Sequence, residues 1–202
     1  MKIDIKGKRA LPDAFKEMTT FKARREARKK ASIRRDTGLL ILRLTMGGLL
    51  AGHGSQKLLG WFGGSGLKGT ADVLESMNLK PGMFWAIGAS ASEFGGGVLT
   101  ASGFLHPLGS LGMMGAMIMA ASKAHWGKPI WASKGGAELS VTYMATALAL
   151  ALTGPGRFSL DRLFGIRLPR ALVITIAIIE AVLLAIGITG RPTLDRAASS
   201  DQ

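Results

Sequence analysis

The stretch RLTMGGLLAGHGSQK, Arg43–Lys57, places an arginine, a histidine and a lysine inside a long apolar, glycine-rich run. The run covers roughly residues 38–60, and about 20 residues at ~1.5 Å each suffice to cross a hydrocarbon core of ~30 Å. Charged side chains at such depth are costly, so they normally face a bundle interior, a cavity or a partner. His53 and Lys57 are four residues apart and share one helix face. The sequence therefore predicts a membrane protein whose first span carries polar residues with a structural or chemical role.

The composition separates a basic beginning from an apolar remainder. Of the 202 residues, 48% are hydrophobic, and the net charge is +13. A basic balance can indicate nucleic acid, but most of the chain is lipid-compatible, which favours anionic lipid headgroups or a membrane partner over a nucleic acid. The chain has no cysteine, so it carries no disulfide, no thiolate nucleophile and no thiolate-bound iron–sulfur cluster. Any redox chemistry must use a bound cofactor or another subunit.

Five apolar segments predict five membrane helices, at about residues 38–60, 82–104, 107–124, 137–153 and 171–190. The loop after the first contains a short amphipathic helix at about residues 70–77. In the weakly apolar second segment, Gly88, Ser92 and Gly96 are four residues apart, a spacing that lets neighbouring helix backbones approach closely. The fold class expected is all-α.

The sequence predicts a basic arm at residues 1–36. This arm is either an interfacial helix from Asp13 onward or a solvated segment that only sets the membrane topology. Basic residues cluster in this arm and again between the fourth and fifth segments: Lys22, Arg24, Arg25, Arg28, Lys29, Lys30, Arg34, Arg35, Arg157, Arg162, Arg167 and Arg170. With five alternating spans both clusters lie on one side, which the positive-inside rule makes cytoplasmic. The expected location is the bacterial inner membrane, with the N-terminus in the cytoplasm and the C-terminus in the periplasm.

Five short motifs together make the chain resemble the DoxX family of small bacterial membrane proteins. They are HGSQK (His53–Lys57), FGG (Phe62–Gly64), SEFGGG (Ser92–Gly97), GGAEL (Gly135–Leu139) and TGPGRFSLDR (Thr153–Arg162). The resemblance implies a four-helix membrane bundle across roughly residues 39–165, with relatives linked to sulfur-compound oxidation, quinone reduction and oxidative-stress complexes. The basic arm and the fifth helix are additions to that pattern. The expected domains are therefore an arm at 1–36, a DoxX-like bundle at 37–165, and an extra helix with a short tail at 166–202.

Five polar residues are predicted to meet in the half of the bundle away from the arm: His53, Gln56, Lys57, Glu93 and Glu138. Such a group could hold a quinone headgroup, with Lys57 or Gln56 donating to a carbonyl oxygen and His53 or a glutamate moving the proton. The other interpretation is a structural network in which Lys57 pairs with Glu93 or Glu138. A bis-histidine haem on His53 and the loop residue His125 is a weaker third possibility. No spacing indicates a metal site.

Two charged residues lie outside this cluster. Arg43, near the start of the first span, is predicted to snorkel to the membrane surface as a topology anchor. Glu180 stands in the middle of the otherwise apolar fifth segment, where an unpaired carboxylate needs a proton or a partner. Glu180 and the arm residues Arg24, Arg25 and Arg28 are therefore candidates for docking.

Two functions fit these features. The first is an accessory or structural transmembrane subunit of a larger membrane redox or energy-transducing complex, bound to lipid and to other subunits of that complex. The second is a quinone-linked oxidoreductase component of the DoxX type that uses the polar cluster. The first predicts co-purification with a larger assembly, and the second predicts bound quinone and activity in the isolated chain.

Overall fold

The computed structural model describes residues 10–189, without the side chains of residues 10–16 and 19, and contains no strand in that range. The prediction of an all-α membrane bundle is thus confirmed. The start of the predicted arm, residues 1–9, and the tail, residues 190–202, lie outside the described part. The α-helices are α1 (Ala10–Leu59), α2 (Gly66–Ser76), α3 (Gly82–Ser102), α4 (Leu108–Lys123), α5 (Glu138–Thr153), α6 (Leu160–Phe164) and α7 (Arg170–Thr189). Two single 3₁₀ turns, η2 (Trp61–Gly63) and η3 (Ala132–Lys134), lie in the loops.

The chain forms two compact units, residues 1–38 and residues 39–202. Helix α1 passes from the first unit into the second without a break, so the predicted helix from Asp13 and the first predicted span are one helix. No Gly or Pro occurs between Asp13 and Thr37 to end it. In the first unit, Asp36 is buried and accepts hydrogen bonds from Arg35 at 3.0 Å and from Ser32 at 3.3 Å. The three docking candidates Arg24, Arg25 and Arg28 are exposed.

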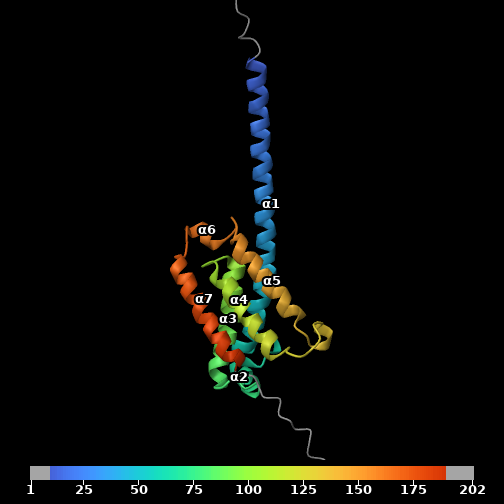
Figure 1. Ribbon diagram of the computed structural model, residues 1–202, viewed down its shortest axis with the longest axis vertical. Helices are drawn as coiled ribbons and strands as arrows, with labels where there is room; N and C mark the ends of the chain where they lie inside the picture. Colours follow the sequence, from blue (N-terminus) through green and yellow to red (C-terminus); the bar gives the residue numbers. More distant parts are fainter. Residues whose placement is uncertain (1–9, 190–202) are drawn as a thin grey trace, which may run out of the picture. The chain divides into compact units, whose positions relative to one another are not determined.

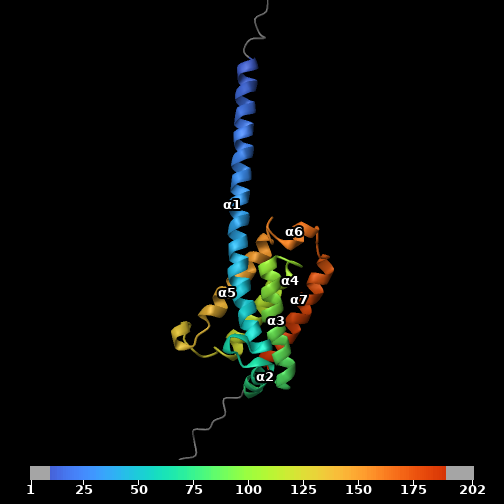
Figure 2. The same ribbon diagram turned by 180° about the vertical axis from the view of Figure 1, so that it is seen from behind.

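In the second unit, α3 and α4 lie at the centre, with α5 on one side and α7 on the other (Figures 1 and 2). Helix α2 packs on α3, and α4 contacts α3, α5 and α7. The core between the helices consists of Leu50, Met113, Ala116, Met117, Tyr143 and Ala147. Three of the six come from the methionine-rich α4, whose flexible thioethers fill irregular gaps.

Small residues bring the central helices together. A Cβ on Gly47 of α1 would lie 2.6 Å from the backbone nitrogen of Ala101 in α3, so the two backbones nearly touch there. Between α3 and α4, a Cβ on Gly96 would lie 3.2 Å from the nitrogen of Met113. The predicted small-residue face is therefore correct at Gly96, but Gly88 has nothing within 4 Å and takes no part. Small residues at a spacing of four do not by themselves show over what length of the helix a neighbouring helix is in contact.

The ends of α3, α4, α5 and α7 match four of the predicted segments closely, whereas α1 ends with the first predicted segment but begins at Ala10. By length and composition, α7 is the one helix of residues 10–189 that qualifies as a membrane span. Helices α4 and α5 have 16 residues each and reach only about 24 Å at ~1.5 Å per residue, short of a ~30 Å core. A five-span topology requires local thinning of the bilayer or helix ends completed by loop residues, and it stays a prediction.

Candidate functional site: two polar clusters

The first polar cluster joins α1 to α3 through an ion pair between Lys57 Nζ and Glu93 Oε1. The Glu93 side chain is only 4% exposed, whereas that of Lys57 is 37% exposed. Lys57 is in the last turn of α1, where a cation also interacts favourably with the helix dipole. The ion pair predicted from the sequence is present, and its acidic partner is Glu93.

Of the remaining members of the predicted cluster, two contact each other near Lys57 and the third lies elsewhere. His53 Nδ1 and Gln56 Oε1 lie 3.3 Å apart on the exposed side of α1, and Gln56 Nε2 donates to the carbonyl of Phe62 at 3.5 Å. Glu138 is exposed and its Oε2 accepts the backbone N–H of Ala132 at 2.8 Å. Glu138 thus closes its own loop and makes no ion pair with Lys57, because the preceding 3₁₀ turn η3 lies within reach of its side chain. We call His53, Gln56, Lys57 and Glu93 the Lys57–Glu93 cluster.

One oxygen of Glu93 remains free inside this cluster. Glu93 Oε2 is buried without a hydrogen-bond partner, as is the hydroxyl of Ser90 one turn earlier on α3. Tyr143 of α5, fully buried in the core, is within electrostatic range of Glu93. An unsatisfied buried carboxylate oxygen costs free energy, so this is the point of the first cluster at which a proton or a ligand donor would be stabilised.

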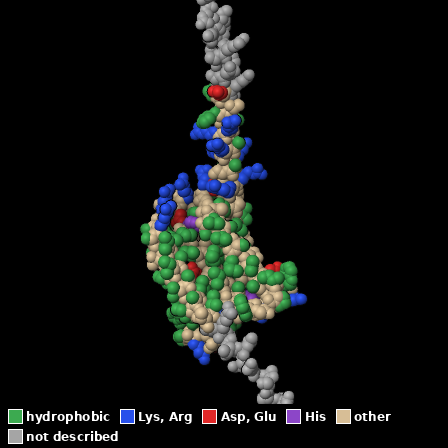
Figure 3. All heavy atoms as spheres, in the orientation of Figure 1, with side chains coloured by type: hydrophobic (Ala, Val, Ile, Leu, Met, Phe, Trp, Pro, Cys, Tyr) green, Lys and Arg blue, Asp and Glu red, His purple; other side chains and the backbone are tan. Residues whose placement is uncertain are grey.

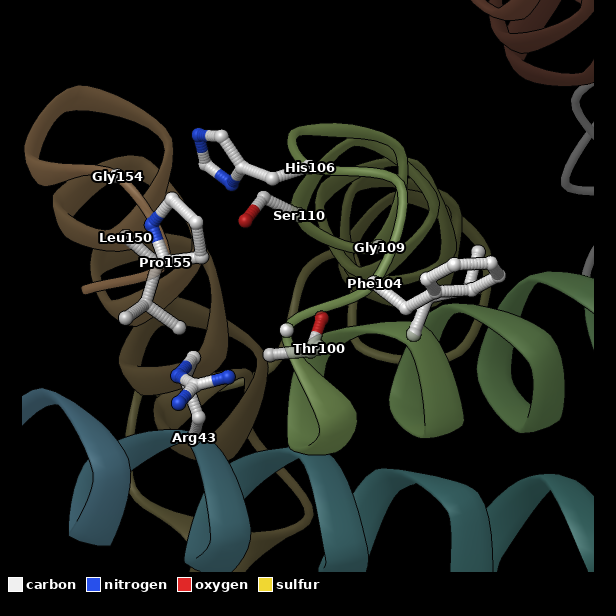
Figure 4. Close-up of a pocket in the computed structure, with 11 residues that line it drawn as sticks. Arg43, Thr100, Phe104, His106, Gly109, Ser110, Leu150, Gly154 and Pro155 are labelled. Carbon is white, nitrogen blue, oxygen red and sulfur yellow. The ribbon is translucent and has the colours of Figure 1, made fainter. Parts of the chain in front are cut away.

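The second polar cluster surrounds Arg43 and was not predicted as a site. Arg43 is 2% exposed rather than snorkelling, and its Nη2 donates to the backbone carbonyl of Phe158 in the loop after α5. Figure 4 shows its guanidinium pointing from α1 into the space between Thr100, Leu150 and Pro155. The predicted role as a surface anchor is therefore wrong, because the loop between α5 and α6 folds back over this point of α1 and supplies an acceptor.

Asp161 holds the turn between α3 and α4 beside Arg43. Its carboxylate accepts the backbone N–H groups of Leu105 and His106, each at 2.8 Å, and its own N–H donates to Gly103 at 3.1 Å. Leu105 has a positive φ of 52°, a strained conformation for a leucine that the two hydrogen bonds to a charged acceptor offset. Asp161 also interacts electrostatically with Arg43. We call Arg43, Thr100, His106 and Asp161 the Arg43–Asp161 cluster.

Two separate features of the structure require glycine at position 103. Its φ is 63°, which ends α3, and a Cβ there would collide with Nη1 of Arg43. On the other side, Arg43 Nε, Arg43 Nη1 and Thr100 Oγ1 are buried without a hydrogen-bond partner. They border a small cavity of about 10 Å³. A space of that size holds at most one water molecule, so the cavity is no substrate pocket.

A larger groove lies next to this cavity. It has a volume of about 580 Å³ and shares His106 and Pro155 with the small cavity. Its lining comes mainly from the loop and short helix that connect α5 to α7: Pro155, Gly156, Ser159, Asp161, Arg162, Gly165, Ile166, Arg167 and Leu168. Ser159 begins α6 by accepting the N–H of Arg162 at 3.3 Å, so the SLDR part of the sequence shapes one wall of the groove.

His106 contributes a pH dependence to folding. Burial lowers the pKa of His106, and the neighbouring Arg43 acts in the same direction, against the carbonyl of Ala151 and the carboxylate of Asp161. Between the lowered pKa and the ordinary value near 6.5, the unfolded chain binds more protons than the folded one, so stability rises with pH in that window. The contribution of His106 is complete above about pH 6.5 and is lost as the pH falls toward its folded pKa.

We therefore expect the wild-type protein to lose more stability than the His106→Gln variant when the pH falls from neutral to about 5. The difference between the stability losses of the two proteins cannot exceed ~1.4 kcal/mol per pH unit, because one proton is involved. Thermal unfolding in mild detergent at several pH values measures this difference. Parallel pH profiles for the two proteins would show that His106 does not titrate on folding.

The other candidates occupy separate places. Glu180 does not face away from the bundle, since its carboxylate lies against the backbone of Gly115 in α4. His125 Nδ1 is 2.7 Å from the carbonyl of Gly135, and His53 is engaged with Gln56. Within residues 10–189, no group of three or more His, Cys, Asp or Glu side chains is placed to hold a metal ion.

The connection between Arg43 and Asp161 was not predicted from the sequence. A signal was available, because TGPGRFSLDR places an aspartate directly after a helix break and Arg43 lacks an acidic residue nearby in its own segment. What the sequence could not indicate is that the two segments, more than 110 residues apart, meet at the same end of the bundle.

Comparisons with known proteins add one finding. Residues 38–126 match the family model DoxX, a range that contains Arg43, the Lys57–Glu93 cluster and His106 but not Asp161 or Glu180. Neither the curated proteins nor the solved structures gave a match. Residues 38–126, a little under half of the chain, are thus similar to the DoxX family.

Proposed function

We propose that this DoxX-type membrane protein is an accessory, non-catalytic subunit of a larger membrane assembly with redox or energy-transducing activity. The observation that carries the proposal is the way in which the charged side chains of the bundle are paired. Lys57 pairs with Glu93, Arg43 binds the carbonyl of Phe158, and Asp161 binds two backbone N–H groups. Each charge joins two segments of the bundle, which is what a structural role requires.

Two features outside the family match are suited to contact with other subunits. Helix α1 has 50 residues, more than twice the ~20 needed to span a membrane, and its part before residue 38 is strongly basic. Helix α7 contacts α4 but is only 6% buried over its apolar window. The basic part of α1 offers charge to an acidic partner surface, and α7 offers an apolar face to lipid or to a neighbouring helix.

The test of this proposal is the charge reversal of Arg24, Arg25 and Arg28 to glutamate in the full-length protein. We expect the wild-type protein to co-purify in mild detergent with an assembly that contains redox cofactors, identified by absorbance and mass spectrometry. The triple variant should remain in the membrane but separate from the assembly. The double variant Lys57→Met/Glu93→Gln, which leaves the arm intact, should stay associated if it folds. A wild-type protein that runs alone contradicts the accessory role.

One observation favours the alternative of a quinone-linked component. The free Oε2 of Glu93 and the exposed imidazole of His53 lie in the same cluster as Lys57, and a quinone headgroup needs a hydrogen-bond donor and a proton carrier. When bound, a quinone would accept two electrons and two protons, with the electrons supplied by a partner. Bound quinone in the isolated chain, lost in a Glu93→Gln variant that still folds, would favour this alternative.

The orientation that suits both functions puts the N-terminus in the cytoplasm and the C-terminus in the periplasm of the bacterial inner membrane. The support is the pair of basic clusters, one before residue 38 and one between α5 and α7. We expect a reporter fused after Gln202 to be active only in the periplasm, and one fused before Met1 only in the cytoplasm. A cytoplasmic signal from both ends would eliminate the five-span topology.

A further inference from the structure

The groove beside His106 has the size and position of a ligand site. Its volume of about 580 Å³ is within the ~300–1,000 Å³ range of small-molecule pockets. Helix α5 ends at Thr153 and α7 begins at Arg170. The groove is built from the connection between them, so it opens where helices leave the hydrocarbon core. That is the depth of lipid headgroups.

The groove carries two positively charged side chains that are not engaged in ion pairs with any described residue. Arg162 and Arg167 line it, both are exposed, and within the described residues neither side chain has an ion pair or hydrogen bond. Figure 3 shows basic side chains gathered around α6 at this end of the bundle. The one acidic residue of the lining, Asp161, is buried and already accepts two backbone N–H groups. Two guanidinium groups therefore remain for an anion.

Apart from His106, the rest of the lining is apolar or small. Ile166, Leu168 and Pro155 lie beside the two arginines, and the hydroxyl of Ser159 donates to the carbonyl of Gly156. Guanidinium groups bind phosphate oxygens in a forked, bidentate geometry. An occupant with a phosphodiester for the arginines and an apolar part for Ile166 and Leu168 matches this lining better than a free anion does.

We infer that this groove binds the headgroup of an anionic phospholipid, with the phosphodiester between Arg162 and Arg167 and the glycerol and first acyl carbons along Ile166 and Leu168. The lipid would occupy the space between the connection and the turn at His106. Basic pockets between membrane helices commonly hold anionic headgroups in this way. The site is separate from the Lys57–Glu93 cluster and does not depend on the accessory-subunit proposal.

The experiment compares phosphatidylglycerol with phosphatidylcholine of the same acyl chains. Full-length protein in a neutral detergent is incubated with equal amounts of both, and retained lipids are counted by native mass spectrometry. We expect the wild-type protein to retain more phosphatidylglycerol than phosphatidylcholine. In the double variant Arg162→Gln/Arg167→Gln, the ratio of the two retained lipids should fall by about fivefold for each arginine removed. The matched control is Arg157→Gln/Arg170→Gln, which removes two charges from the same connection but none from the lining.

A second measurement separates lipid from soluble phosphate. Thermal unfolding followed by tryptophan fluorescence should shift upward with phosphatidylglycerol and not with excess inorganic phosphate. Both double variants should melt like the wild type in phosphatidylcholine, since all four arginines are exposed. Equal retention of the two lipids, an equal loss of preference in both double variants, or stabilisation by inorganic phosphate alone would each overturn the proposal.

Discussion

Replacing Lys57 by methionine is expected to lower the free energy of unfolding by about 3 kcal/mol, because it leaves the buried carboxylate of Glu93 without a counter-charge. The reverse change, Glu93→Gln, should cost only about 1 kcal/mol, since an ammonium on a flexible stem that is 37% exposed can turn toward water. The double variant Lys57→Met/Glu93→Gln should cost less than Lys57→Met alone. Denaturant titration in mixed micelles, with all variants in one detergent, measures these differences.

The control for this cycle is Lys68→Met, an equivalent loss of charge at an exposed position of α2. It should change stability by no more than ~0.5 kcal/mol. If Lys57→Met and Lys68→Met unfold alike, the ion pair does not contribute to the fold. Additive effects of the Lys57 and Glu93 changes would show that the two side chains do not interact.

An even larger effect is expected at Gly97, where α3 meets α1. A Cβ on Gly97 would lie 2.6 Å from the carbonyl oxygen of Gly47 and 2.9 Å from the Cα of Ala51. These are backbone atoms, so no side chain can turn aside and the helices must separate. Gly97→Ala should therefore destabilise the bundle by at least ~3 kcal/mol, at the upper end of overpacking costs.

Gly95, two residues earlier on the same helix, provides the matched control. Nothing lies within 4 Å of a Cβ added there, and removing a mid-helix glycine stabilises a helix by roughly 0.5–1 kcal/mol. We expect Gly95→Ala to be neutral or stabilising in the same titration. If Gly97→Ala and Gly95→Ala gave equal stabilities, the close approach of α1 and α3 would not exist in the folded protein.

The apolar segments were predictable because hydrophobic length reports directly on a membrane helix. The predicted segment 137–153 corresponds to α5 at Glu138–Thr153, and 107–124 corresponds to α4 at Leu108–Lys123. Proline and glycine at the ends made these boundaries readable. The continuity of α1 was less accessible, because a change from basic to apolar residues alters the environment of a helix without ending it.

The polar residues were only half predictable. Lys57 needed an acidic partner, and the sequence contained two candidates, Glu93 and Glu138. Glu93 pairs with Lys57 because α3 packs against α1, whereas the carboxylate of Glu138 accepts a hydrogen bond from Ala132 in the preceding loop. Glu180 needed a partner as well, and α7 turns it toward Gly115, where the missing side chain leaves room. The role of each group in lipid contact, docking or proton transfer stays a prediction.

The amino-acid sequence by itself determined the all-α membrane class, the boundaries of the helices after α1 and the need of each buried charge for a partner, because these depend on local hydrophobicity, chain length and solvation. Only the tertiary structure decided which partners meet. Arg43 reaches the carbonyl of Phe158, 115 residues away, because a loop folds back over α1 and offers its acceptor. Such a contact depends on how the whole bundle packs, and no local pattern of residues encodes it.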